Sequence, residues 1–169
     1  MIFRLKSRLS SKGDICMVDE TLILRKLSEL DEYFKQIAEY EKVTAAQYSG
    51  DWKIQRIVER TLQMMIETCV DIAGHIISDK GFRIPKSYSD AFLVLRENNI
   101  LSDQLFSSVE KMAKFRNIIV HHYDKVDAEI VVGILKKNLK DFEGYKDAIV
   151  NFLKTENSHE NSPHRSSKT

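Results

Sequence analysis

The stretch from Asp51 to Ser78, DWKIQRIVERTLQMMIETCVDIAGHIIS, decides the fold, because its apolar side chains cover most of the circumference of a helix. A surface helix has one apolar stripe, whereas a helix that is apolar nearly all round packs on more than one side. We therefore expect this helix to lie at the centre of the domain. It keeps one narrow polar stripe, which consists of Arg60, Gln63, Glu67, Asp71 and His75. This stripe either faces water or lines a cleft.

Amphipathic patterns flank the central helix on both sides. Upstream, apolar residues at helical spacing predict a helix from Asp19 to about Thr44, namely Ile23, Leu27, Leu30, Phe34 and Ile37. Ser49-Gly50-Asp51 then separates the two helices and caps the second.

Three more helices are predicted downstream. Ser87 fits the N-cap of a short helix that ends near Asn98, with Asp90 placed to accept a hydrogen bond from the Ser87 amide. Ser102 fits the next N-cap, and Asp127 opens a last helix whose apolar residues are Val131, Leu135, Leu139, Phe142, Tyr145, Ile149 and Phe152. No strand pattern is present. The expected fold is all-α, an up-and-down bundle of about five helices.

Length and composition bound the domain organisation and the class of protein. A chain of 169 residues with 43% apolar residues makes about one domain. We expect an N-terminal extension over residues 1–16, the helical domain over 17–154, and a disordered tail over 155–169. A net charge of +1 excludes a bulk positive field, so any contact with nucleic acid must be local.

The cysteines and the hydropathy pattern indicate a cytoplasmic protein. Cys16 and Cys69 lie far apart without a C-x-x-C motif, which argues against a disulfide framework and against a zinc site. No apolar run approaches the roughly 20 residues that a membrane span needs. We expect no cofactor and no contact with a membrane.

Arg116 interrupts an apolar stripe on the helix that starts at Ser102. With Leu105 taken as zero, Arg116 falls near the middle of the apolar residues Val109, Met112, Ala113, Ile119 and Val120. A guanidinium keeps its charge and is costly to bury alone. Arg116 must therefore pair with a carboxylate, such as Glu67 or Asp71, or face a groove or a subunit boundary where an anion binds.

His121 lies five residues after Arg116, about 140° around a regular helix. Either the helix ends near Val120 and the chain turns back, or the arginine and histidine that act together come from two copies of the chain. Histidine exchanges a proton near neutral pH, and arginine stabilises a phosphate. Together they suit metal-free cleavage of an RNA phosphodiester bond.

The stretch Arg116-Asn117-x-x-x-His121-x-Tyr123 resembles the R-x4-H-x-Y motif of the HepT proteins in the HEPN superfamily. The likeness covers roughly Val18 to Leu153. It includes Gln63, Glu67, Asp71 and His75 on the central helix, the stretch Gly81-Phe82-Arg83-Ile84-Pro85-x-Ser87-Tyr88, and Lys125-Val126-Asp127.

This resemblance implies a homodimeric HEPN bundle that acts as a ribonuclease toxin on mRNA or tRNA. Its implied partner is an antitoxin of the minimal nucleotidyltransferase class (MntA-type), which AMPylates Tyr123. Arg116 and His121 are the implied catalytic residues, with Asn117, His122, Glu67 and Asp71 in support. His122 gives a looser R-x5-H spacing, but the spacing to Tyr123 selects His121.

Other interpretations remain open at this stage. A metal site built from His121, His122, Asp124 and Asp127 is weakly supported, because adjacent histidines rarely point at one ion. The chain also fits a HEPN module without catalytic activity that binds nucleotide or RNA. A helical dimerisation module, in which Arg116 forms only an interface ion pair, is a further alternative.

Overall fold

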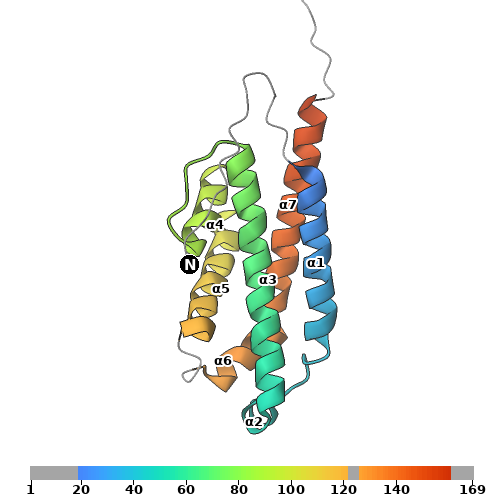
Figure 1. The fold of residues 1–169 in the computed structure, drawn as a ribbon, viewed down its shortest axis with the longest axis vertical. Helices are drawn as coiled ribbons and strands as arrows, with labels where there is room; N and C mark the ends of the chain where they lie inside the picture. Colours follow the sequence, from blue (N-terminus) through green and yellow to red (C-terminus); the bar gives the residue numbers. More distant parts are fainter. Residues whose placement is uncertain (1–18, 122–125, 161–169) are drawn as a thin grey trace, which may run out of the picture.

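The computed structural model describes residues 19–121 and 126–160, and every regular element in these two ranges is helical. In chain order the elements are α1 (Glu20–Ala38), α2 (Ala45–Gly50), α3 (Trp52–Asp79), α4 (Tyr88–Glu97), α5 (Asp103–His121), α6 (Ala128–Gly133), η2 (Ile134–Asn138) and α7 (Leu139–Glu160). η2 is one turn of π-helix, which we call the π-turn. The long helices α1, α3, α5 and α7 run along the bundle and alternate in direction (Figure 1). The predicted all-α up-and-down bundle is confirmed, since five of the described helices have ten residues or more. The homodimer stays a prediction.

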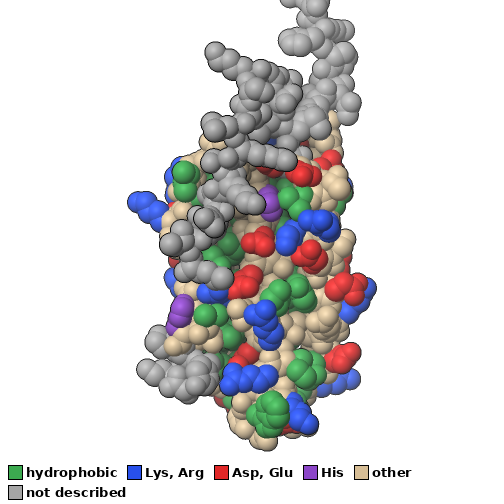
Figure 2. Space-filling model, viewed as in Figure 1, with side chains coloured by type: hydrophobic (Ala, Val, Ile, Leu, Met, Phe, Trp, Pro, Cys, Tyr) green, Lys and Arg blue, Asp and Glu red, His purple; other side chains and the backbone are tan. Residues whose placement is uncertain are grey.

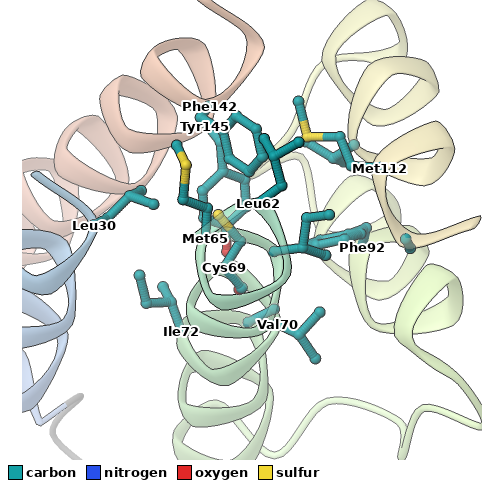
Figure 3. Packing of buried hydrophobic residues seen from close by; sticks show 14 of the residues in the cluster. Leu30, Leu62, Met65, Cys69, Val70, Ile72, Phe92, Met112, Phe142 and Tyr145 are labelled. Atoms are coloured by element: carbon teal, nitrogen blue, oxygen red, sulfur yellow. Dashed lines mark hydrogen bonds between the residues drawn. The ribbon is translucent and has the colours of Figure 1, made fainter. Parts of the chain in front are cut away.

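The central position of α3 is also confirmed. α3 packs against α1, α2, α4 and α5, and its buried residues form the middle of one hydrophobic core. Figure 3 shows Leu62 of α3 beneath Phe142 and Tyr145 of α7, with Leu30 of α1 and Met112 of α5 on opposite sides. An apolar α3 can bury its surface only when helices cover several of its sides, which is why the other helices surround it.

The expected N-caps are present, because serine and aspartate side chains accept hydrogen bonds from unpaired amides in the first helical turn. Asp51 caps α3, Ser87 caps α4, and the Ser102 hydroxyl accepts from the Leu105 amide at the start of α5. The expected partner of Asp90 was wrong. Its carboxylate accepts from the Lys86 amide at 2.7 Å and from the Arg83 guanidinium, and these bonds connect the first turn of α4 to the loop before it.

Two helix boundaries differ from the expectation. α1 ends at Ala38 instead of continuing to Thr44, because Thr44 and Gln47 form a capping box that starts the separate helix α2. The last helix is interrupted by the π-turn and then continues to Glu160, past the expected end of the domain at Lys154.

Near that end, the Asn157 amide donates to the Glu20 carboxylate at the start of α1, so α7 remains attached to the bundle there. The extension over residues 1–16 and the end of the tail, 161–169, lie outside the described residues. No helix among those described is both long and apolar enough to cross a membrane.

A buried hydrogen bond between α7 and α3 gives a direct test of this core. The Tyr145 hydroxyl donates to the Cys69 carbonyl oxygen at 2.8 Å, and Tyr145 is fully buried. Tyr145→Phe should lower the free energy of unfolding by about 1 kcal/mol, the net value of one such hydrogen bond. Tyr145→Ala should cost about 3–5 kcal/mol, because it also leaves a cavity. Urea unfolding followed by circular dichroism measures both, and equal losses in the two variants would contradict this account.

Candidate functional site

α5 carries both Arg116 and His121, and it remains helical through His121. The helix thus ends one residue past Val120, but it includes His121, so both side chains lie on the same regular helix. Five residues of regular helix separate the two side chains by about 140° around the axis and about 7.5 Å along it. Within one chain, Arg116 and His121 do not converge on a common ligand.

Arg116 is held by an ion pair with Glu67 of α3. Its Nε and Nη2 atoms both donate to Oε1 of Glu67, at 3.0 and 2.6 Å. Gln63, one turn earlier on α3, donates to the same oxygen at 2.9 Å. Of the two carboxylates that the sequence offered as partners for Arg116, the structure selects Glu67.

The charged form of the Glu67 carboxylate is stabilised by these partners. Partial burial raises its pKa, but the hydrogen bonds from Gln63 and Arg116 and the charge of Arg116 outweigh burial, so the pKa is lowered overall. Glu67 is therefore ionised at neutral pH. The contact between α3 and α5 contains a true ion pair, which fixes the position of the guanidinium.

The pair is not sealed from solvent. The Arg116 side chain is 11% exposed and that of Glu67 is 26% exposed. A guanidinium has five N–H donors, and no described residue accepts a hydrogen bond from Nη1 of Arg116. Arg116 thus keeps donors with which it can contact a second anion, such as a phosphate.

Tyr88 belongs to this site, although sequence reasoning did not assign it a role. The guanidinium carbon of Arg116 lies 4.8 Å from the centre of the Tyr88 ring, a cation–π distance. Tyr88 is the first residue of α4, and the preceding loop is held by Arg83, which binds both Asp90 and Glu97. No spacing within the sequence connects Tyr88 to Arg116, so only the packing of α4 against α5 reveals the contact.

The other predicted residues lie apart from Arg116 and Glu67. Asp71 is exposed and pairs with Lys26 of α1 at 3.4 Å. Asn117 and His121 are exposed on α5. The polar stripe of α3 is partly exposed: Arg60 and Asp71 face solvent, whereas Gln63, Glu67 and His75 are half-buried. The stripe therefore both borders solvent and supplies the carboxylate that binds Arg116. Figure 2 shows acidic and basic side chains interspersed over the face formed by α1 and α3.

Several predicted residues lie outside the described ranges, namely His122, Tyr123 and Asp124. Asp127 is described, and it caps α6 by accepting from the Glu129 amide at 2.8 Å. Within residues 19–121 and 126–160, no group of three histidine, cysteine or acidic side chains is arranged to hold a metal ion.

Comparisons with known proteins agree with the fold and with the family that the sequence resembles. The mRNA nuclease HepT of Shewanella oneidensis is 34% identical over 128 residues, which cover 76% of this chain and 96% of that protein. The tRNA nuclease HepT of Aphanizomenon flos-aquae is 27% identical over 140 residues, which cover 82% and 94% of the two chains.

Solved structures give the same result. A toxin–antitoxin structure with AMP-PNP has a TM-score of 0.73 and 32% identity, covering 78% of this chain and 99% of that one. The tri-AMPylated HEPN toxin of Shewanella oneidensis in complex with MNT antitoxin has a TM-score of 0.71 and 32% identity, with 82% and 98% covered. A family model described as Ribonuclease HepT-like matches residues 30–149. The chain therefore belongs to the Ribonuclease HepT-like family.

Proposed function

We propose that this chain is an endoribonuclease toxin that cleaves RNA without a metal ion and is neutralised when a nucleotidyltransferase antitoxin AMPylates Tyr123. The observation that carries the proposal is the motif Arg116-Asn117-x-x-x-His121-x-Tyr123, which begins on α5 of a HepT-like bundle. Two relatives are named as an mRNA nuclease and a tRNA nuclease. The proposed substrate is accordingly mRNA or tRNA.

Cleavage needs a base, an acid and a site for the phosphate. The base removes the proton from the 2′-hydroxyl, whose oxygen attacks the neighbouring phosphorus. The bond to the 5′-oxygen breaks, the acid protonates that oxygen, and a 2′,3′-cyclic phosphate remains. We assign proton transfer to His121 and the phosphate to Arg116, whose donors on Nη1 are not used by Glu67.

In this proposal, a second copy of the chain brings an Arg116 and a His121 side chain together. Because α5 is continuous, Arg116 and His121 of one chain point in different directions. A two-fold axis beside the end of α5 would bring Arg116 of one protomer toward His121 of the other, so that each of the two sites in the dimer combines one Arg116 with one His121. Ile118 and Val120, which are 40% and 37% exposed, are apolar surface that such an interface would cover.

AMPylation of Tyr123 provides a physical means of inhibition. It would place a bulky phosphodiester with a fixed negative charge within a few residues of His121, where it would compete with substrate phosphate for Arg116. A solved neighbour is described as a tri-AMPylated toxin bound to an MNT antitoxin. We propose the same class of partner for this chain.

One observation favours a second candidate, a HEPN module without catalytic activity that binds nucleotide or RNA or serves for dimerisation. Arg116 is already paired with Glu67 and packed on Tyr88, so it also fulfils a purely structural role in the bundle. In that case, loss of Arg116 would lower stability without any effect on RNA. The following experiments separate the two candidates.

The assigned proton transfer predicts a large loss of activity in His121→Ala. Removing a positioned acid or base typically slows a reaction about 10²- to 10⁴-fold. Cleavage of total RNA, tRNA and mRNA should therefore nearly stop, while His122→Ala, the matched control, should retain most of its activity. Both assays contain EDTA, which should leave the wild-type rate unchanged. Reversed effects of the two substitutions would overturn the assignment of His121, and loss of activity in EDTA would overturn the metal-free mechanism.

The shared groove predicts complementation between two inactive variants. Arg116→Ala and His121→Ala are each expected to be inactive, but refolding them together yields mixed dimers in which one site combines an intact Arg116 with an intact His121. Such a mixture should recover up to about a quarter of the wild-type rate, since half the dimers are mixed and each has one site. A mixture that light scattering shows to be dimeric but that remains inactive would place both residues of a site on the same chain.

The proposed inhibition predicts that Tyr123→Phe stays toxic in the presence of the antitoxin. The substitution removes the acceptor oxygen and keeps the ring, so the variant should fold and cleave RNA. Mass spectrometry of wild-type protein co-expressed with its nucleotidyltransferase should find added AMP on the peptide that contains Tyr123. Full neutralisation of Tyr123→Phe by the active nucleotidyltransferase would leave Tyr123 with a structural role alone.

A further inference from the structure

A pocket of about 240 Å³ lies between α3, α5, α6, the π-turn and α7, and Arg116 is not among the residues that line it. Its wall is mostly apolar and includes the aromatic residues Phe115 and Phe142, with Ile130 of α6 at the lip. Polar groups come from Ser108, Lys111 and Asn138. The volume is just below the roughly 300–1,000 Å³ of pockets that hold drug-sized ligands, so the pocket suits a group about the size of one nucleobase.

The π-turn forms part of this pocket. Ile134 and Asn138, its first and last residues, both line the cavity. Short π segments within α-helices are rare and frequently occur at functional sites. The irregular backbone and the cavity therefore coincide, and nothing in the proposed cleavage mechanism uses either of them.

Four lysines belong to the elements that form the pocket. Lys111 of α5 lines it, Lys136 and Lys137 belong to the π-turn, and Lys140 lies in the first turn of α7. All four are exposed, and none forms an ion pair with a described carboxylate. The acidic group in the pocket lining, Asp141, accepts a hydrogen bond from Asn138 at 3.0 Å. For a chain with a net charge of only +1, this is a local concentration of positive charge.

An exposed stripe on α5 connects the pocket to His121. Lys111, Lys114 and His121 follow one another at spacings of three and seven residues, so they lie on one side of the helix. The stripe is about 15 Å long from Lys111 to His121. A few nucleotides of single-stranded RNA span this distance.

We propose that the pocket receives one unstacked base of the RNA substrate, a few nucleotides away from the scissile phosphate, while Lys111 and Lys137 contact the neighbouring phosphates. The inference rests on the proposed function, because it assigns RNA as the substrate. Sequence-dependent recognition of single-stranded RNA commonly splays a base out, stacks it on an aromatic side chain and contacts its polar edge. Phe115, which is 8% exposed, supplies the ring, and Ser108 and Asn138 supply hydrogen-bonding groups.

The surroundings favour a base over an apolar side chain from a protein partner. A side chain needs no cations around the pocket, whereas RNA brings a phosphate on each side of the inserted base. The polar groups in the lining also match the polar edge of a base. The pocket would then contribute to the choice of cleavage site, separately from the chemistry at Arg116 and His121.

The proposal is tested with a substitution that fills the pocket and removes no buried side chain from the core. Ile130 is 54% exposed at the lip, so Ile130→Trp can occupy the cavity without deleting a buried side chain. Leu24→Trp is the matched control, because Leu24 is 46% exposed on α1 and lies outside the pocket lining. Circular dichroism and thermal unfolding establish that both variants fold. Binding is measured in a His121→Ala background, with fluorescently labelled single-stranded RNA that carries one abasic site at each position in turn.

Ile130→Trp should weaken RNA binding about tenfold or more, the usual effect of removing one stacked base, and should change the pattern of cleavage sites in the active protein. One abasic position should weaken binding by a similar factor, and the Ile130→Trp variant should no longer distinguish that position. Leu24→Trp should behave as the parent protein.

Lys111→Glu should reduce the slope of log affinity against log salt by about 0.7, the value for one phosphate of a single strand. Lys42→Glu, at an exposed residue outside the pocket, should leave that slope unchanged.

Each contrary outcome has a definite meaning. Unchanged binding and an unchanged cleavage pattern in Ile130→Trp would overturn the pocket proposal and leave the proposed function intact. Loss of dimerisation or of antitoxin binding in that variant, with RNA binding unchanged, would show that the pocket holds a protein partner and would also overturn it. A wild-type protein that binds RNA but never cleaves it would refute the nuclease function alone, since the abasic scan still tests the pocket. A wild-type protein that neither binds nor cleaves RNA would refute both.

Discussion

The burial of α3 is the constraint on which the rest of the structure depends. A 28-residue helix with apolar side chains on most of its circumference is stable in water only when other helices cover it. α1, α2, α4, α5 and α7 provide that cover, and the strip left open carries Gln63, Glu67 and Asp71. The position of the site therefore follows from the packing, because Arg116 on α5 meets the side of α3 that offers it a carboxylate.

The sequence predicted those features that depend on neighbouring residues in the chain. The apolar stripe of α1, the near-complete apolar surface of α3 and the caps at Asp51, Ser87 and Ser102 are local patterns with local causes. Features that depend on contacts between distant segments were not predictable in this way. The choice of Glu67 over Asp71 required knowing where Lys26 lies, and the Tyr88 contact required the packing of α4 on α5. The π-turn has no clear signal in the sequence.

The proposed function gives Arg116 two roles that usually compete. An arginine in an apolar interface needs a carboxylate to offset its desolvation, yet an arginine that binds phosphate needs free donors. The contact with Glu67 uses only Nε and Nη2 on a single oxygen, so one arginine can satisfy both demands. Lysine would not do this, because an ammonium group lacks the fixed, planar arrangement of donors. The Tyr88 ring keeps the guanidinium in place from the side without occupying any N–H group.

The first and last helices of the described bundle, α1 and α7, have neighbouring outer ends. Asn157 near the end of α7 donates to Glu20 at the start of α1, and Figure 1 shows these ends together, opposite the end of the bundle where α5 reaches His121. The 19 residues of α5 span about 28 Å of that length. Neighbouring surface termini are the arrangement that tolerates circular permutation and domain insertion. A permuted chain that joins these two ends of the described bundle would thus keep the Arg116–Glu67 contact.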